Sequence, residues 1–254
     1  MSINCGLGKV FTYRKTDTIN VGHGVYDPNK VFTAEDENGK IYVDDVRSKI
    51  VFDKSEEPGN TVKIGGRDYP YVQIGNWLVI TENLDYKYDG LSIAPAGNPT
   101  TPAAWYYNND EATYGVNGNK YGLLYNGYAA IYMYEHASDL FPAGWNLLPD
   151  NGWYQFLMSL PNGYSSGLEL RSTEGWNSNS NGNNEYQFDG KPAGLRTSSS
   201  STFVDVGDEC RVWQGNGNTC LRMFSSKYGN IHDSTPTTYN SKMGASVRLF
   251  KYVG

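Results

Sequence analysis

TVKIGGRDYPYVQI, residues 61–74, is the stretch that decides the fold. Its two ends, residues 61–64 and 69–74, are rich in β-branched and aromatic side chains, which favour strands. Gly65-Gly66 between them supplies the turn. The pattern therefore predicts strand, turn and strand, with a domain that begins just before it.

The 254 residues divide into two parts by composition. Residues 1–58 hold most of the acidic runs and no tryptophan, and a Glu-Glu-Pro-Gly-Asn breaker separates them from residues 59–254. In the first part, residues 31–33 and 40–43 flank Asn38-Gly39, a dipeptide suited to a β-hairpin turn. An isolated hairpin is marginally stable in water, so we expect another copy of the chain to support this small β-rich module.

Two segments of the larger part carry helix signals. Residues 122–139 are apolar all round and predict a buried helix of two or three turns. Residues 151–160 predict a second helix with Asp150 as its N-cap. Its apolar stripe, spaced i, i+3, i+4 and i+7, is expected in the core and consists of Trp153, Phe156, Leu157 and Leu160. From residue 162 to 239 regular periodicity largely disappears, which predicts long ordered loops.

Composition excludes several classes of protein. The net charge of −6, from 21 basic and 27 acidic residues, offers no field for a nucleic-acid backbone. The sequence contains no apolar run of about 18 residues, so we expect no membrane insertion. Its first residues lack the pattern of a secretion signal, so we expect synthesis in the cytoplasm. Cys5, Cys210 and Cys220 contain no C-x-x-C pair, which argues against a zinc site or a disulfide framework.

Catalytic motifs are not recognisable in the sequence. His23, His136 and His232 lie far apart, and no nucleophile elbow, phosphate-binding loop or zinc-protease helix is present. We therefore expect no enzyme activity, no catalytic residue, no metal and no cofactor. A pair of carboxylates for glycoside hydrolysis stays open, because its members can be distant in sequence.

Residues 210–240 favour a binding surface. Tyrosine and tryptophan offer large rigid contact areas, while Asn, Ser and Gly adapt their hydrogen bonds, as in antibody paratopes. An aromatic plane at Trp213 or Trp176 could stack on a sugar. In the alternative, Asn and Gly build turns and Trp213 and Phe224 are core residues. The candidate ligand-binding residues are Trp176, Arg211, Trp213, Asn216, Asn218, Arg222, Tyr228, Asn230, His232, Tyr239 and Asn240.

Four motifs in order resemble the Fibrobacter succinogenes major paralogous (FISUMP) domain over about residues 60–254. They are VQIGNWLVITENL at 72–84, YGLLYN at 121–126, PAGWNLLP at 142–149 and GASVR at 244–248. The resemblance implies an α+β, C-type-lectin-like fold: a twisted antiparallel sheet, two helices, paired first and last strands, and long loops that carry the ligand contacts. The small β-rich module would precede it.

The departures from related families also matter. The triplets that bind calcium and sugar in lectins are missing, and Cys210 and Cys220 are too far apart in sequence to match the reactive pair of formylglycine-generating enzymes. A calcium site and oxidase activity are therefore not expected. Arg196 and Arg248 lie inside family-like motifs, where a guanidinium with five donors can hold several loop carbonyls, so we interpret both as structural.

Residues 25–33 and 39–46 resemble short ribbons at the heads of tail-fibre and head-fibre proteins of bacteriophages that infect gut bacteria. The combined resemblances imply a non-enzymatic virion fibre or spike protein that binds a host cell-surface receptor, either glycan or protein. Residues 1–58 would attach it to other virion proteins and join copies, as a homotrimer. The alternatives are a bacterial cell-surface, adhesin-like module of the same fold and a carbohydrate-active enzyme.

Overall fold

The chain divides into two compact units, Met1–Gly59 and Asn60–Gly254. The computed structural model describes the second unit apart from residues 119, 216–219, 225–230 and 235–240. Residues 150, 220–224 and 232–234 are described by their backbone alone, as are five short strands of the first unit.

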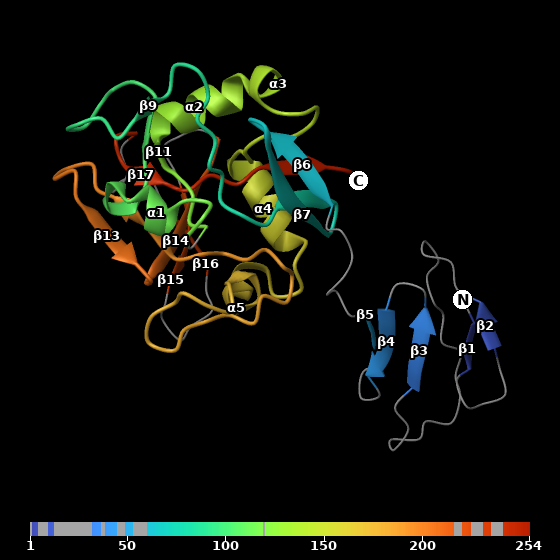
Figure 1. The fold of residues 1–254 in the computed structure, drawn as a ribbon. Helices are drawn as coiled ribbons and strands as arrows, with labels where there is room; N and C mark the ends of the chain where they lie inside the picture. Colours follow the sequence, from blue (N-terminus) through green and yellow to red (C-terminus); the bar gives the residue numbers. More distant parts are fainter. Residues whose placement is uncertain are drawn as a thin grey trace. The chain divides into compact units, whose positions relative to one another are not determined.

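The five strands of the first unit form two antiparallel sheets (blue in Figure 1). Asp36 pairs with Gly39, so the hairpin predicted around Asn38-Gly39 is confirmed, with Gly39 as the first residue of its second strand. The two-stranded sheet consists of β1 (Ser2–Asn4) and β2 (Val10–Thr12). The three-stranded sheet consists of β3 (Phe32–Asp36), β4 (Gly39–Asp44) and β5 (Lys49–Phe52), in that order.

The second unit begins with the predicted strand, turn and strand, which is confirmed. Gly65 and Gly66 both have positive φ angles, +56° and +86°, which suit the twist of a two-residue hairpin turn. A Cβ atom at Gly65 would also lie 2.2 Å from the ring of Tyr86, so the turn has no room for a side chain. The antiparallel sheet of four strands has the order β18 (Phe250–Tyr252), β8 (Trp77–Ile80), β7 (Arg67–Ile74) and β6 (Thr61–Ile64).

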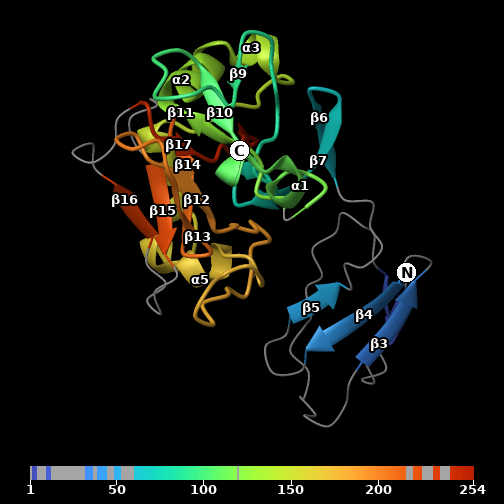
Figure 2. The ribbon, with the colours of Figure 1, turned by 60° about the vertical axis from the view of Figure 1, so that its left-hand side comes forward.

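Two further sheets follow. The strands of the larger one are short, and all neighbours in it are antiparallel except β9 and β10. Its order is β13 (Phe203–Val206), β12 (Ala193–Arg196), β17 (Gly244–Ala245), β11 (Leu124–Asn126), β10 (Ala103–Trp105) and β9 (Ser92–Ile93). The other is an antiparallel meander of β14 (Glu209–Trp213), β15 (Cys220–Phe224) and β16 (Ile231–Ser234), which lie side by side in Figures 1 and 2.

Two helices of the described residues exceed one turn. Asn126 caps α2 (Gly127–Glu135) by accepting the backbone N–H of Ala129. The second, α4 (Asp150–Met158), begins at Asp150, and its N-cap position is Pro149, which has no side-chain acceptor. The prediction of an Asp150 cap is therefore wrong, because the helix starts one residue earlier. Single turns are α1 (Glu111–Tyr114), α3 (Ala137–Leu140), α5 (Gly167–Leu170) and the 3₁₀ turns η1 (Tyr107–Asn109) and η2 (Gly163–Ser165).

The apolar stripe of α4 packs on the four-stranded sheet (Figure 1). All four of its predicted residues are buried, which confirms their place in the core. The ring of Trp153 meets that of Phe250 in β18 edge to face at 4.9 Å, and Phe156 meets the same ring at 5.3 Å. This packing anchors the last strand to the helix, since such aromatic pairs add to the area they bury.

The last strands differ from the sequence-based expectation. The end of the chain forms two short strands, β17 and β18, with residues 246–249 between them. Ser246 leaves the sheet to bridge Val212, and Arg248 turns into the interior. The closing strand β18 pairs with β8 rather than with β6, the first strand of the unit. The second unit is thus a mixed α/β domain with several small sheets and few helices.

Candidate functional site

The meander β14–β15–β16 brings three of the predicted binding residues into one row. Arg211 pairs with Arg222, and Arg222 pairs with His232. Directly opposite positions on neighbouring antiparallel strands lie about 4.5–5.5 Å apart. Strand pairing therefore gathers residues that are 11 and 10 positions apart in the chain.

Arg211 is only 6% exposed. Its guanidinium pairs with Glu209 and lies 3.8 Å from the carboxylate of Asp205. A third contact, at 3.8 Å, joins it to the sulfur of Met243. The charge of Arg211 is thus compensated inside the protein, which gives this side chain a structural role.

Trp213 and Trp176 are enclosed by the protein, with exposed fractions of 0% and 6%. The indole N–H of Trp213 donates to the carbonyl of Tyr125 at 2.6 Å. That of Trp176 contacts the hydroxyl of Ser172 at 3.1 Å, and the guanidinium of Arg171 lies over its ring. Neither ring offers a face to a sugar, so the structure does not support the stacking role expected for them. Both tryptophans are core residues.

The remaining predicted residues, Asn216, Asn218, Tyr228, Asn230, Tyr239 and Asn240, lie outside the described residues. The strands that carry their segments are nevertheless informative. Trp213 pairs with Cys220, and Cys220 pairs with Ser234, so these three positions form the row at one end of the meander. The segments that follow Trp213 and Ser234 therefore leave the sheet at the same end.

Arg248 organises the interior beside this meander. Its Nε donates to the side-chain oxygen of Asn83 at 2.7 Å, and its other nitrogens donate to the carbonyls of Ile80, Phe188 and Asp189. Arg248 is fully buried, so each donor must find a partner within the protein. The structural role predicted for it is confirmed.

Arg196 in β12 acts in the same way. It donates to the carbonyl of Gly97 and, at 3.1 Å, to the side-chain oxygen of Asn98. Its guanidinium also lies 4.0 Å from the centre of the Trp105 ring. The structural role predicted for Arg196 is likewise confirmed.

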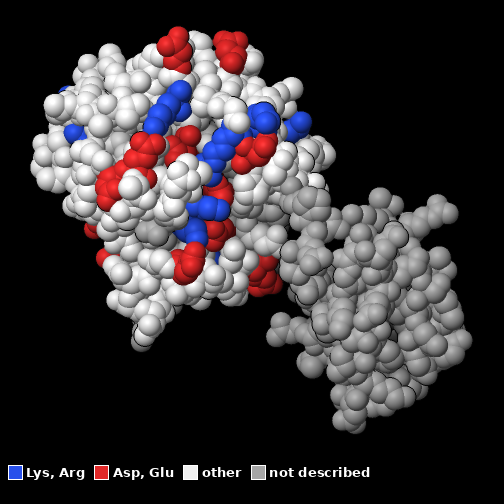
Figure 3. Space-filling view, viewed as in Figure 1, with Lys and Arg blue, Asp and Glu red and all other residues white. Residues whose placement is uncertain are grey.

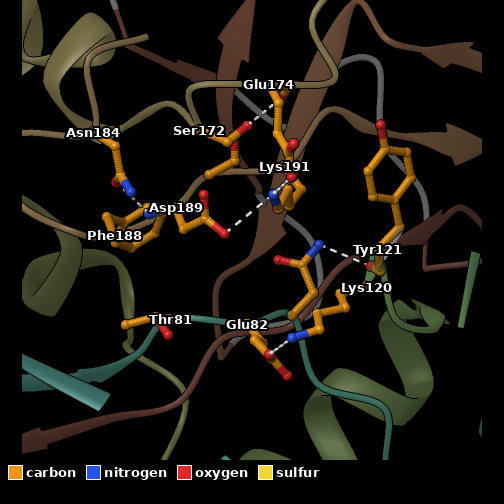
Figure 4. A network of polar contacts seen from close by, with 12 residues as sticks. Thr81, Glu82, Lys120, Tyr121, Ser172, Glu174, Asn184, Phe188, Asp189 and Lys191 are labelled. Atoms are coloured by element: carbon orange, nitrogen blue, oxygen red, sulfur yellow. Dashed lines mark hydrogen bonds and ion pairs between the residues drawn. The ribbon is translucent and has the colours of Figure 1, made fainter. Parts of the chain in front are cut away.

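A polar network continues toward the surface from two residues that Arg248 binds, Asn83 and Asp189. Figure 4 shows its ion pairs of Glu82 with Lys120 and of Asp189 with Lys191. Glu82 binds Arg67 and, at 3.0 Å, Lys120. Lys191 lies between Glu174 at 3.1 Å and Asp189 at 3.3 Å. Asn83 connects the Glu82 group with the Lys191 group. Its amide N–H donates to the carbonyl of Tyr121, next to Lys120, and its side-chain oxygen accepts from Arg248, which also binds the carbonyl of Asp189.

The sequence analysis did not predict this network. Glu82 and Asn83 do stand inside a quoted motif, and that was the available signal. No sequence signal pointed to Lys120 or Lys191, because each pairs with a carboxylate whose position only the fold determines. Figure 3 shows basic and acidic side chains mixed in a band across one face, with further charges scattered around it.

A second polar cluster surrounds the hydroxyl of Tyr106. It lies 2.6 Å from a carboxylate oxygen of Asp85 and 3.0 Å from one of Glu111, and Lys87 pairs with Glu111 at 2.9 Å. Burial, reinforced by the two carboxylates, raises the pKa of Tyr106 well above its ordinary value. The hydrogen bond with Lys87 lowers the pKa of Glu111. The phenol stands between the two carboxylates, where a glycoside hydrolase would need room for substrate.

Cys210 and Cys220 lie on neighbouring strands of the meander. Burial raises the pKa of Cys210 to about 12. Cys210 is opposite Met223, whereas Cys220 is opposite Trp213, so they lie about 10 Å apart along the hairpin, beyond the roughly 7 Å reach of a disulfide.

Among the described side chains no cluster of three or more His, Cys, Asp or Glu residues could hold a metal ion. Within the same residues no helix is long and apolar enough to span a membrane.

These features define a class: a loop-rich α/β domain whose buried arginines and amides hold irregular segments in place. The family model of the Fibrobacter succinogenes major domain matches residues 72–251. The chain belongs to this family, which confirms the resemblance found in its four motifs. No curated protein and no solved structure matches the chain.

Proposed function

We propose that the second unit is a ligand-binding domain with a C-type-lectin-like fold, and that the chain is a non-enzymatic bacteriophage fibre or spike protein. It binds a host cell-surface receptor, glycan or protein, through the segments that leave the β14–β15–β16 meander. Residues 1–58 attach it to other virion proteins and join copies as a homotrimer.

The proposal rests on a contrast between polar side chains that are buried in the interior and polar segments that leave the meander. The motif side chains Asn83 and Arg248 are committed to the interior, where they hold three chain segments together. The meander beside them is buried along the whole of β14, and two segments rich in Asn, Gly and Thr, residues 214–219 and 235–240, follow the strands that end on one side of it. A rigid scaffold that carries adaptable loops is the usual construction of a binding site.

Support for the lectin-like part comes from the architecture. Among its described residues the unit contains two helices longer than one turn and long irregular stretches between β11 and β14, as the family resemblance implies. Its closing strand β18 lies in the first sheet, as the edge strand beside β8, and does not pair with the first strand β6.

The test is binding of the fluorescently labelled full chain to a panel of bacterial cells. The double variant Asn218→Ala, Tyr239→Ala changes one residue in each of the two segments that follow Trp213 and Ser234. It should lower cell binding at least about tenfold, because tyrosines often dominate such interfaces. Its melting temperature should match that of the parent. Tyr154→Ala is the matched control, since this tyrosine is 56% exposed on α4, outside the two proposed binding segments, and should leave binding unchanged.

The outcomes separate the candidate functions. Periodate treatment of the cells abolishes binding to a glycan, and protease treatment abolishes binding to a protein. Equal binding by the double variant and the parent contradicts the proposed site. Failure of the parent to bind any cell contradicts the attachment function, and release of sugars from the cells would favour the carbohydrate-active alternative.

A further inference from the structure

Two pairs of neighbouring residues in the second unit have backbone angles that their residue types rarely adopt. The φ angles are +53° and +59° at Asn108 and Asn109, and +56° and +54° at Ser178 and Asn179. This left-handed region costs free energy in residues other than glycine, and asparagine tolerates it better than serine does. All four residues of these left-handed pairs are exposed. Glycine would relieve the strain at each position, so the side chains that stand there need an explanation.

Other residues with such angles use their side chains to stabilise the fold. Lys120 pairs with Glu82, and the side chain of Asn184 accepts the backbone N–H of Asp189. The side chains of the two left-handed pairs, by contrast, form no hydrogen bond or ion pair with any described residue. Their side chains therefore remain available to a ligand.

The residues around each pair are firmly anchored, which maintains the strain. Tyr107, before the first pair, is 7% exposed, and its ring lies 5.4 Å from that of Phe203. Before the second pair, the N–H of Asn177 donates to the carbonyl of Gly207 at 2.8 Å. After that pair, the N–H of the buried Ser180 donates to the carbonyl of Asn177 at 3.0 Å. Strained residues persist only where their surroundings determine them in this way, and they cluster at sites that bind ligands.

Both left-handed pairs border β13, the edge strand of the larger sheet (orange in Figure 1). Tyr107 packs on Phe203 at the start of β13, and Asn177 is bonded to Gly207, just after its end. The strand β14 begins two residues after Gly207, whereas the proposed binding segment 214–219 follows the other end of β14. The β13 surface, which consists of β13 and the two left-handed pairs, is therefore distinct from the proposed receptor site.

The groups on the β13 surface suit an uncharged sugar. Asparagine amides and the serine hydroxyl both donate and accept hydrogen bonds, as sugar hydroxyls do. The rings of Phe203 and Tyr114 are half-buried in the same aromatic cluster and offer apolar contact. On β13 itself the side chain of Asp205 is 40% exposed, and its carboxylate accepts from hydroxyl groups but repels anions.

We propose that the β13 surface binds uncharged carbohydrate. This goes beyond the proposed function, because it adds a second recognition site whose residues and strain belong to the second unit alone. An exposed surface binds a single sugar weakly, on the order of 1 mM, so a display of many sugar copies is needed to detect the contact.

The experiment measures binding of the fluorescently labelled full chain to an array of immobilised cellohexaose, maltohexaose, mannohexaose and oligogalacturonate. The parent should bind at least one of the three neutral sugars and not the acidic oligogalacturonate. Two double variants, Asn108→Gly with Asn109→Gly and Ser178→Gly with Asn179→Gly, should each lower this binding at least about tenfold, because several hydrogen bonds are lost. Asn151→Gly is the matched control: it makes the same change at an exposed position in the first turn of α4 and should bind like the parent.

Stability separates a binding role from a structural one. Glycine removes the strain of the left-handed backbone, so the melting temperature of both double variants should rise or stay within about 4 °C of the parent. Tryptophan fluorescence follows the melting, because all six tryptophans lie in the second unit. A larger fall of the melting temperature in both double variants overturns the proposal, since the four side chains would then serve the fold.

Other outcomes also overturn the proposal. Parental binding by either double variant does so, and so does a parent that binds none of the neutral sugars or binds oligogalacturonate more strongly than them. The receptor-site variant Asn218→Ala, Tyr239→Ala should keep array binding. If that variant loses it while the glycine variants keep it, the sugar binds at the meander segments, which overturns the β13 surface and leaves the proposed function intact.

Discussion

A fully buried arginine is costly unless its donors find partners, and Arg248 directs four of its five N–H donors to one side-chain amide oxygen and three carbonyls. Lysine has the same charge but only three donors, and it has no planar fork to span several segments. The identity of the residue at this position is therefore set by geometry as well as by charge.

We predict that Arg248→Lys destabilises the second unit by roughly 3 kcal/mol, within the range for breaking one partner of a buried charged network. Urea denaturation followed by tryptophan fluorescence measures this, because all six tryptophans lie in that unit. The control Lys251→Arg, three residues along in β18, should stay within about 0.5 kcal/mol of the parent. Equal stability of Arg248→Lys and the parent would contradict the role assigned to the network.

Trp213 gives a second prediction at this scale. Trp213→Ala removes a buried indole and leaves the carbonyl of Tyr125 without its donor, so we expect a loss of about 3–5 kcal/mol. Tyr154→Ala, at an exposed position, should change stability by less than about 0.5 kcal/mol. If Trp213→Ala unfolds at the same urea concentration as the parent, Trp213 is not a core residue.

Among the elements, α2 depends on the residue before it. Asn126 accepts the N–H groups of Ala129 and Ala103 and donates to the carbonyl of Thr101, so one buried amide joins the helix to β10 and the preceding loop. Asp110 caps the single turn α1 with one acceptor, the bond to Thr113, at an exposed position.

We predict that Asn126→Ala costs roughly 2–3 kcal/mol, since it removes a cap worth about 1 kcal/mol and leaves a second buried N–H unpaired. Asp110→Ala should cost clearly less. Thermal melting of both variants beside the parent makes the comparison. A larger loss for Asp110→Ala would show that the buried links of Asn126 contribute little.

The elements also show what the sequence could predict. The β6–β7 hairpin followed from Gly65-Gly66, and the stripe of α4 followed from its spacing, because both signals are local. The α4 boundary was placed one residue late, since an aspartate can stand at the N-cap or in the first turn. The division of residues 244–252 had no local signal: Arg248 leaves the strand for partners that lie 60 and 168 residues away.

The candidate site was predictable in part for the same reason. Composition identified residues 210–240, but it could not separate a tryptophan that binds from one that packs, because both sit among Gly and Asn. Register then placed Arg211, Arg222 and His232 in one row. The burial of Trp213 depends on Tyr125, 88 residues earlier in the chain, and only the assembled fold reveals it.

At the scale of the whole molecule, charge predicts the response to acid. The pKa values of Glu111 and Asp110 are lowered in the folded state, by the hydrogen bond from Lys87 and by that from Thr113. Groups with depressed pKa values stabilise the fold above their unfolded pKa values, near 4, and this support is lost as pH falls through the folded values.

We therefore predict that Glu111→Gln lowers the melting temperature at pH 6–7 and that the difference from the parent shrinks toward pH 3. Melting curves at low salt over this range measure it, with Glu135→Gln on α2 for comparison. A difference that is constant with pH would mean that the ion pair with Lys87 does not stabilise the fold.

The link between Arg248 and residues 80–84 and 188–189 has a consequence for synthesis. While the codons for residues 244–252 are still untranslated, β8 lacks β18, one of its two neighbour strands, and the carbonyls of Ile80 and Phe188 lack the guanidinium of Arg248. The second unit can therefore reach its native state only after these last residues have emerged from the ribosome.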